Sequence, residues 1–301
     1  MTAQNRVLER TTSTNTGRFT AADWGLFWGI ALIWGSSFLL IAIGLESFHP
    51  GVITLARVGL GAVALMALPA ARRPIEAADR RRLVVLSLLW VAIPFTLFPI
   101  AEQYINSAVT GLLNGAMPIF AALVAAIFLR DFPRGAQLAG LVTGFAGVVL
   151  ISAPSIGEGS NEALGVALVV GATVCYGFAV NIAAPLQRRY GSIPVMAKML
   201  ALATIWTLPY GLYGLGSSSF SIGPAIAVAA LGVVGTGIAF AIMASLVGSV
   251  GATRASFITY LIPFVALALG VAFLGDEVSP VAVVGIVLVV GGAFLASRSR
   301  R

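Results

Sequence analysis

Ten apolar runs, each about 20 residues long, follow one another along this chain and carry almost no charged side chains. An α-helix needs about 20 apolar residues to cross a hydrocarbon core about 30 Å thick. The sequence therefore predicts an all-α integral membrane protein with ten transmembrane helices. Their approximate limits are 22–43, 50–69, 83–103, 107–129, 134–152, 163–183, 193–214, 222–246, 253–274 and 279–297.

The composition excludes several other classes of protein. Charged residues make up 10% of the chain, too few to cover a water-facing surface, so membrane lipids must be its main solvent. The net charge of +7 comes from arginines in short clusters between the runs, a pattern typical of membrane topology rather than of nucleic-acid binding. With one cysteine, Cys175, and one histidine, His49, we expect no zinc site, no other metal site and no cofactor.

The basic residues predict the orientation. Sixteen of the 18 fall on one side of a ten-helix arrangement, and acidic residues gather on the other. The positive-inside rule then places both termini in the cytoplasm of a bacterial cell, with the protein in the inner membrane. We expect a cytoplasmic N-terminal tail over 1–21 and a cytoplasmic C-terminal tail over 298–301.

The two halves of the chain resemble each other. Laid over each other without gaps, 107–152 and 252–297 match at nine positions, including Pro118 with Pro263 and Gly140 with Gly285. This predicts two five-helix repeats, 22–152 and 163–297. Because five is an odd number of crossings, the second repeat is inverted relative to the first, which is typical of transporters with a binding site between the repeats.

Two prolines lie near the middle of apolar runs, in the stretches TGLLNGAMPIF (110–120) and ASFITYLIPFV (255–265). A proline cannot donate to the carbonyl four residues before it, which here belongs to Asn114 or Thr259. In hydrocarbon such a carbonyl normally faces protein or water. The pair indicates a polar pathway lined by both halves, although each proline alone could be a packing kink.

Taken in order, these motifs resemble a known family. The helix count, the repeat, Trp34-Gly35-Ser36-Ser37-Phe38, Arg57, the stretch from Ala108 to Pro118 and the stretch from Tyr260 to Glu277 are similar to the EamA family of the drug/metabolite transporter superfamily. The resemblance implies a metabolite carrier with a central cavity. Within the family, the chain resembles most the YddG-type exporters of aromatic amino acids.

The candidate substrate-binding residues are polar or polar-tipped groups inside the runs, together with the two prolines. They are Trp34, Ser37, Thr110, Asn114, Pro118, Tyr176, Asn181, Thr259, Tyr260 and Pro263. A few polar groups among aromatic ones suit a zwitterion with an apolar side chain. Interhelical hydrogen bonding, or core packing for Trp34, is the alternative role.

Arg57 is a charged residue within a run, which makes it a functional candidate with an expected partner. Glu102, near the outer end of the third run, is the available acid. We expect an Arg57–Glu102 ion pair; contact with a substrate carboxylate is the second possibility for Arg57. Because no acid lies at mid-depth, we expect facilitated transport or exchange rather than obligatory proton coupling.

The sequence thus predicts an exporter of aromatic or neutral amino acids that works as a monomer by alternating access. We do not expect an enzyme, because intramembrane serine proteolysis needs a general base within the membrane and His49 lies in a loop. A nucleotide-sugar or sugar-phosphate carrier, a drug carrier and a channel-like pore remain as alternatives. Phosphate ligands favour several Arg or Lys residues, and channels favour rings of repeated polar residues.

Overall fold

The computed structural model describes residues 20–129, 134–158 and 160–297, and all regular secondary structure in these ranges is helical. The predicted tails fall outside them except for residues 20 and 21. The first half contains α1 (Ala21–Gly35), α2 (Ser37–Leu45), α3 (Pro50–Met66), η2 (Pro69–Arg72), η3 (Ala77–Asp79), α4 (Arg80–Leu86), η4 (Ser87–Ala92), α5 (Ile93–Ala101), α6 (Ser107–Asn114), α7 (Met117–Leu129) and α8 (Ala136–Glu158).

The second half begins with the longest helix of the described chain. Its elements are α9 (Ser160–Tyr190), α10 (Ser192–Gly214), η5 (Leu215–Ser217), α11 (Ile222–Gly232), η6 (Val233–Ile238), α12 (Ala239–Val250), α13 (Ala252–Ala255), η7 (Ser256–Tyr260), α14 (Ile262–Leu269), η8 (Gly270–Leu274) and α15 (Pro280–Ser297). Of the shorter elements, η4, η6 and η8 are π-helical, and η2, η3, η5 and η7 are 3₁₀-helical.

Eight helical stretches in the described ranges are long and apolar enough to cross a membrane. They are Ala21–Leu45, Ala77–Ala101, Ser107–Ile127, Ala136–Pro154, Asn161–Tyr190, Ser192–Ser217, Ile222–Val250 and Ser256–Leu274. Two shorter apolar helices, Pro50–Met66 and Pro280–Ala296, coincide with the second and tenth predicted runs. The chain is therefore a multi-span, all-helical membrane protein.

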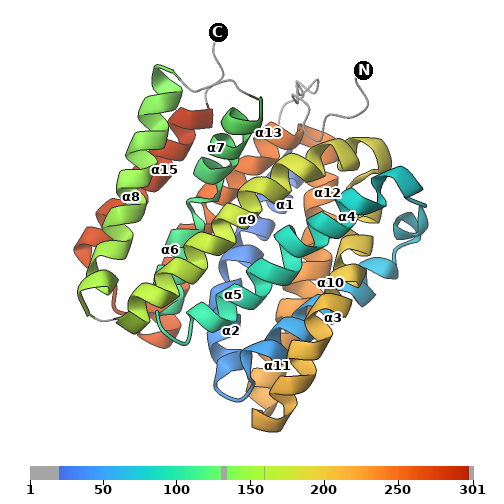
Figure 1. Ribbon diagram of the computed structural model, residues 1–301, viewed down its shortest axis with the longest axis horizontal. Helices are drawn as coiled ribbons and strands as arrows, with labels where there is room; N and C mark the ends of the chain where they lie inside the picture. Colours follow the sequence, from blue (N-terminus) through green and yellow to red (C-terminus); the bar gives the residue numbers. More distant parts are fainter. Residues whose placement is uncertain (1–19, 130–133, 159, 298–301) are drawn as a thin grey trace.

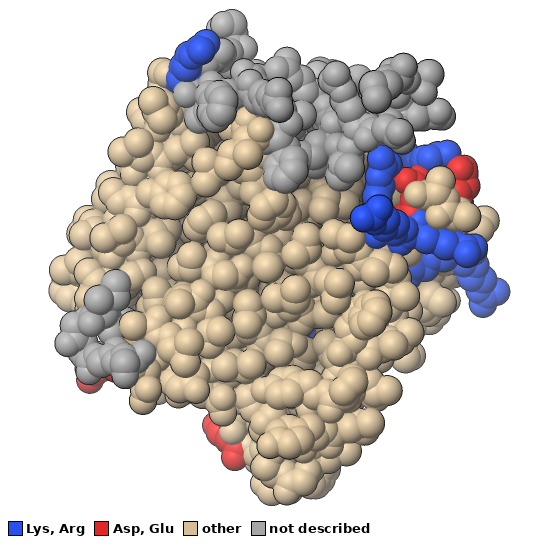
Figure 2. All heavy atoms as spheres, in the orientation of Figure 1, with Lys and Arg blue, Asp and Glu red and all other residues tan. Residues whose placement is uncertain are grey.

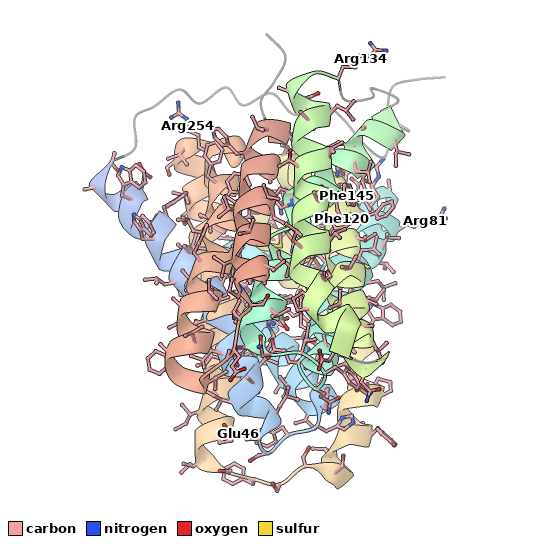
Figure 3. All side chains as sticks on the ribbon, turned by 90° about the vertical axis from the view of Figure 1, so that its left-hand side faces the viewer. Glu46, Arg81, Phe120, Arg134, Phe145 and Arg254 are labelled. Atoms are coloured by element: carbon pink, nitrogen blue, oxygen red, sulfur yellow. The ribbon has the colours of Figure 1, made fainter. Side chains whose placement is uncertain are left out.

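The helices form a bundle (Figure 1) whose two ends differ in charge. Arg81, Arg134 and Arg254 lie towards the end where α1 begins and α15 ends, which we call the basic face (Figure 3). Glu46 lies at the opposite end, which we call the acidic face and where α15 begins. Figure 2 shows basic side chains gathered towards the upper end of the view in Figure 1.

Small residues allow the closest helix contacts, as is usual in lipid. Helices α8 and α15 lie side by side and run antiparallel (Figures 1 and 3). A Cβ added at Gly140 would lie 2.6 Å from the Gly292 carbonyl oxygen, and one at Gly147 would lie 2.5 Å from the Gly285 carbonyl oxygen. Larger side chains at these positions would force the two helices apart.

Candidate functional site

Three membrane stretches are interrupted near their middle, and the interruptions pack against one another. The first lies at Ser36, between α1 and α2; the second at 115–116, between α6 and α7; and the third at Leu261, between η7 and α14. A Cβ on Gly35 would lie 2.4 Å from the Val265 Cβ, and one on Gly115 would lie 2.6 Å from the Pro263 Cγ. The two halves of the chain therefore meet at their helix breaks.

The structure modifies the prediction for the two prolines. Pro263 lies in the first turn of α14, and Pro118 is the second residue of α7. Proline is well tolerated in the first turn of a helix, where the N–H groups have no intrahelical acceptors. Each proline thus helps to begin a new helix after a break, rather than kinking a continuous one.

A cavity of about 260 Å³ lies beside these breaks. Its aromatic and sulfur-containing residues are Trp34, Phe38, Trp90, Phe95, Phe98, Tyr176, Phe240, Met117, Met196 and Met243. Its polar residues are Ser37, Arg57, Asn114, Gln187, Ser192, Ser256 and Thr259. A mainly apolar wall with a few polar groups is typical of small-molecule sites.

Five of the ten residues predicted to bind substrate line this cavity, namely Trp34, Ser37, Asn114, Tyr176 and Thr259. Asn114 is the most informative, because its side-chain oxygen Oδ1 is buried and has no hydrogen-bond partner in the described chain. A buried acceptor without a donor costs about 1–3 kcal/mol. A ligand that supplied an N–H or an ammonium group would remove that cost.

The other five predicted residues do not line the cavity. The Thr110 hydroxyl is buried and donates to the Asn106 carbonyl at 3.0 Å. The Asn181 amide nitrogen donates to the Ala121 and Gly177 carbonyls, and the Tyr260 hydroxyl donates to the Ala293 carbonyl. Asn181 and Tyr260 thus form the interhelical bonds that were the alternative role. The last two are the prolines, Pro118 and Pro263, which begin helices beside the cavity.

Arg57, on α3, reaches the cavity from a buried position. Its Nε donates to the Thr236 hydroxyl at 3.2 Å, and its Cζ lies 3.7 Å from the centre of the Phe95 ring. Thr236 belongs to the π-helix η6, and its hydroxyl donates in turn to the Leu231 carbonyl at 3.0 Å. These contacts fix the guanidinium group, while no hydrogen bond from its two terminal nitrogens is found among the described residues.

The expected Arg57–Glu102 ion pair is not formed in this structure. Both Glu102 carboxyl oxygens are buried and have no hydrogen-bond partner among the described residues. Glu102 lies one residue beyond the end of α5, on the acidic face, whereas Arg57 is held by Thr236 and Phe95. The anchor from η6 was not evident from the sequence, because π-helical geometry has no simple residue pattern.

Several residues of the cavity were not predicted from the sequence. One is Trp90, which lines the cavity from the π-helix η4. Trp24 and Trp28 are 48% and 50% exposed, as a lipid-facing position requires. Gln187 and Ser192, polar residues on either side of the turn from α9 to α10, could have been noted as cavity candidates.

The cavity reaches towards the basic face. Gln187, Ser192 and Val247 line it, and they lie near the end of α9, the start of α10 and the end of α12. Towards the acidic face, aromatic packing fills the space: the Phe38 and Phe98 ring centres are 5.6 Å apart, and those of Phe98 and Tyr176 are 6.0 Å apart. We infer from these ring contacts that the cavity is closed on its acidic side.

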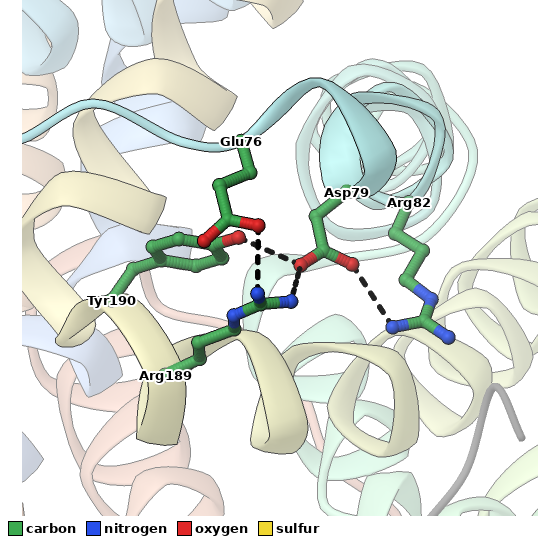
Figure 4. Close-up of polar contacts among 5 residues, drawn as sticks. All are labelled: Glu76, Asp79, Arg82, Arg189 and Tyr190. Atoms are coloured by element: carbon green, nitrogen blue, oxygen red, sulfur yellow. Dashed lines mark hydrogen bonds and ion pairs between the residues drawn. The ribbon is translucent and has the colours of Figure 1, made fainter. Parts of the chain in front are cut away.

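An ionic cluster joins the segment between α3 and α4 to the end of α9 (Figure 4). Asp79 is buried and accepts from Arg82 at 3.0 Å, from Arg189 at 2.9 Å and from the Tyr190 hydroxyl at 2.8 Å. Arg189 also pairs with Glu76 at 2.7 Å. We call these five residues the loop clamp, because they hold the 76–82 segment on the second half of the chain.

No group of three or more potential metal ligands occurs in the parts of the chain that the structure describes. The described cavity lining also lacks a histidine, a cysteine and any carboxylate. The groups that the described lining offers are one guanidinium group, an unpaired amide oxygen, hydroxyl groups and aromatic faces.

Comparison with known proteins identifies the family. Among curated relatives, a probable terminal-alkyne amino-acid exporter from Streptantibioticus cattleyicolor is 26% identical and covers 93% of this chain and 95% of its own length. The uncharacterized transporter YdfC from Bacillus subtilis is 28% identical over 86% of each chain. The uncharacterized inner membrane transporter YedA from Escherichia coli K12 is 24% identical over 90% of this chain and 91% of its own.

A solved crystal structure shares the fold, with a TM-score of 0.65 and 20% identity over 92% of this chain and 97% of the other. The model of the EamA-like transporter family matches twice, at residues 23–153 and 163–298. These two matches cover both halves of the chain, and their division agrees with the predicted repeat. The chain belongs to the EamA-like transporter family.

Proposed function

We propose that this protein exports neutral amino acids, with a preference for apolar or aromatic side chains, across a bacterial inner membrane. The observation that carries the proposal is the pair formed by Arg57 and Asn114. Both line one cavity; the terminal nitrogens of Arg57 make no bond among the described residues, and the Asn114 oxygen lacks a donor. A guanidinium group suits a carboxylate, and an amide oxygen suits an ammonium group.

The remaining lining supports an apolar side chain on the substrate. Aromatic rings and methionines dominate the wall, and methionine adapts to ligands of different shape. The named activity of the Streptantibioticus relative, export of an amino acid, agrees with this substrate class. The name of YedA supports the inner membrane as the location.

The alternatives fit the cavity less well. Most nucleotide sugars carry two phosphates, but the described lining contains one cationic side chain, and the volume of about 260 Å³ is small for such a ligand. A cationic drug would favour an acidic group, and none lines the described cavity. A channel would need a path open at both ends, whereas aromatic packing closes the acidic side.

We further propose ten membrane spans in two inverted repeats, with both termini cytoplasmic. The glycine contacts support the inversion. Gly140 and Gly147 correspond to Gly285 and Gly292 in the repeat alignment, and the contacts are reciprocal: Gly140 approaches Gly292, and Gly147 approaches Gly285. Equivalent helices that cross antiparallel in this way are expected from an in-plane pseudo-two-fold axis. The charge difference between the two faces supports the orientation.

With this orientation the cavity faces the cytoplasm, as an exporter requires for loading. Transport then follows by alternating access, in which the aromatic packing near Phe98 opens and the basic side closes. The helix breaks at Ser36, 115–116 and Leu261 are the places where such motion can occur without breaking continuous helices.

Transport into inside-out proteoliposomes tests the proposal. We expect uptake of labelled phenylalanine or leucine, and none of a sugar phosphate or a lipophilic cation. Asn114→Ala should weaken substrate affinity about 10- to 100-fold, because a hydrogen bond to a charged ammonium group contributes about 1.5–3 kcal/mol. Trp28→Ala, at a lipid-facing position, is the control and should change little. Uptake of sugar phosphate but of no amino acid would refute the proposal.

A further inference from the structure

Glu102 is a buried acid that the proposed binding site does not use. It follows directly after α5, and both of its carboxyl oxygens are buried without a hydrogen-bond donor among the described residues. An ionised carboxylate in such a place loses its hydration and gains no hydrogen bond in return, at a cost of several kcal/mol. The carboxyl group is therefore held in its neutral, protonated form.

A second carboxylate reinforces this conclusion. Asp276 accepts through Oδ2 from the Ser107 hydroxyl at 2.7 Å and from the Ala108 N–H at 2.9 Å, so its charge is well satisfied. Gly275, with φ of +68°, forms the left-handed turn that directs Asp276 back towards the chain, and the Asp276 N–H donates to the Gly270 carbonyl at 3.1 Å. A fixed negative charge near Glu102 disfavours a second one.

The charged groups that act on Glu102 are Asp276, from the loop after η8, and Arg57, from α3. Tyr176, on α9, faces Arg57 in turn. The other titratable residues of this region, Tyr104, Glu162 and Glu277, line a separate cavity of about 380 Å³. The Arg57 side chain is anchored on Thr236 and makes no hydrogen bond with Glu102, so its positive charge offsets only part of the cost of ionising the acid.

Glu102 lies where the closed side of the transporter must open. It is four residues, about one helical turn, beyond Phe98, whose ring packs between Phe38 and Tyr176 at the end of the substrate cavity. Opening this packing towards the acidic face would admit water to Glu102. Hydration would remove the cost of ionisation, and the proton could then leave.

We propose that Glu102 is a proton-binding site whose protonation holds the acidic side of the transporter closed and whose deprotonation accompanies opening. The proposal rests on the proposed alternating access, because it assigns the proton to one of the two states. It predicts that transport depends on the pH outside the cell, which differs from the proton-independent exchange expected from the sequence. The ligand is the proton; a sodium ion at Glu102 and Asp276 is the competing occupant that the test must exclude.

Infrared spectroscopy of the protein in lipid tests the site without any substrate. With ¹³C-carboxyl-labelled glutamate, we expect a protonated carboxyl band at neutral pH that is lost in Glu102→Gln. The band should remain in Glu46→Gln, a matched change at an exposed glutamate on the same face. In Asp276→Asn the band should disappear at a lower pH than in the wild type, since the neighbouring negative charge that favours the neutral form is gone. Absence of the band in the wild type, or its persistence in Glu102→Gln, would overturn the proposal, as would its loss on adding sodium at constant pH.

Accessibility of the cavity from the acidic face tests the link to opening. The test uses a Cys175→Ser background that carries a cysteine at Ser37, with an impermeant maleimide added outside. As the outside pH rises, the Ser37 cysteine should react up to about tenfold faster per pH unit, relative to an exposed cysteine at Ser219. The Ser219 cysteine corrects for ionisation of the thiol itself. In Glu102→Gln the ratio should stay low at every pH. A wild-type pH dependence in Glu102→Gln would contradict the proposal, whether or not amino acids prove to be the substrate.

Discussion

The contact between Gly115 and Pro263 gives a quantitative test of how the two halves meet. A methyl group on Gly115 would lie 2.6 Å from the Pro263 Cγ, 3.0 Å from the Leu112 carbonyl oxygen and 3.3 Å from the Ile286 Cδ1. The proline ring and the carbonyl are rigid, so the helix breaks must move apart. Overpacking of this kind costs about 1–3 kcal/mol, and we expect Gly115→Ala to lower the unfolding free energy by that amount.

A double-mutant cycle isolates the contact. Pro263→Ala removes Cγ, so the cost of Gly115→Ala should fall by about 0.5–2 kcal/mol in that background, although the Leu112 contact remains. Gly25→Ala is the control, because nothing lies within 4 Å of an added Cβ there; it should be neutral or stabilising by up to about 1 kcal/mol. SDS-driven unfolding followed by circular dichroism measures all of these variants. Equal costs of Gly115→Ala in both backgrounds would show that the two breaks do not touch.

Three further predictions follow from the same structure. Pro118→Ala and Pro263→Ala should each fold but lose most transport, because alanine lets the two helical segments join across the break; full transport in both variants would contradict this. Asp79→Asn should destabilise the protein by about 1–3 kcal/mol in thermal unfolding, since hydrogen bonds to Arg82, Arg189 and Tyr190 lose their charged acceptor; an unchanged stability would show that the loop clamp is too solvated to matter. Impermeant maleimide added outside intact cells should label a cysteine at Ser219 but not one at Ala77, and labelling of both would exclude the proposed topology.

The sequence predicted the fold class well because bilayer thickness imposes a simple requirement on every spanning helix. The family and the correspondence between the two halves were also visible, since the family model matches both halves of the chain. The glycine matches between the halves correspond to the closest contacts between α8 and α15. In these cases one residue type carries the physical reason.

The residues around the cavity were harder to predict because their roles depend on helix rotation and backbone irregularity. Asn114 and Asn181 are both amides inside apolar runs, yet Asn114 lines the cavity and Asn181 bonds to the Ala121 and Gly177 carbonyls. Trp90 faces the cavity from a π-helix, whose rotation a regular helical period does not give. The predicted Arg57–Glu102 ion pair is absent from the structure for a similar reason, since Arg57 is held by Thr236 instead of Glu102.

The central claim is that the carboxylate of an amino acid binds Arg57 in this cavity. Equilibrium binding of a neutral amino acid and of its carboxamide, to wild type and to Arg57→Gln, tests it most directly. Charge-assisted hydrogen bonds contribute about 1.5–3 kcal/mol, so the wild type should favour the acid over the amide by about 10- to 100-fold. Arg57→Gln should abolish that preference while binding the amide about as well as the wild type. An undiminished preference for the acid in Arg57→Gln would contradict the account.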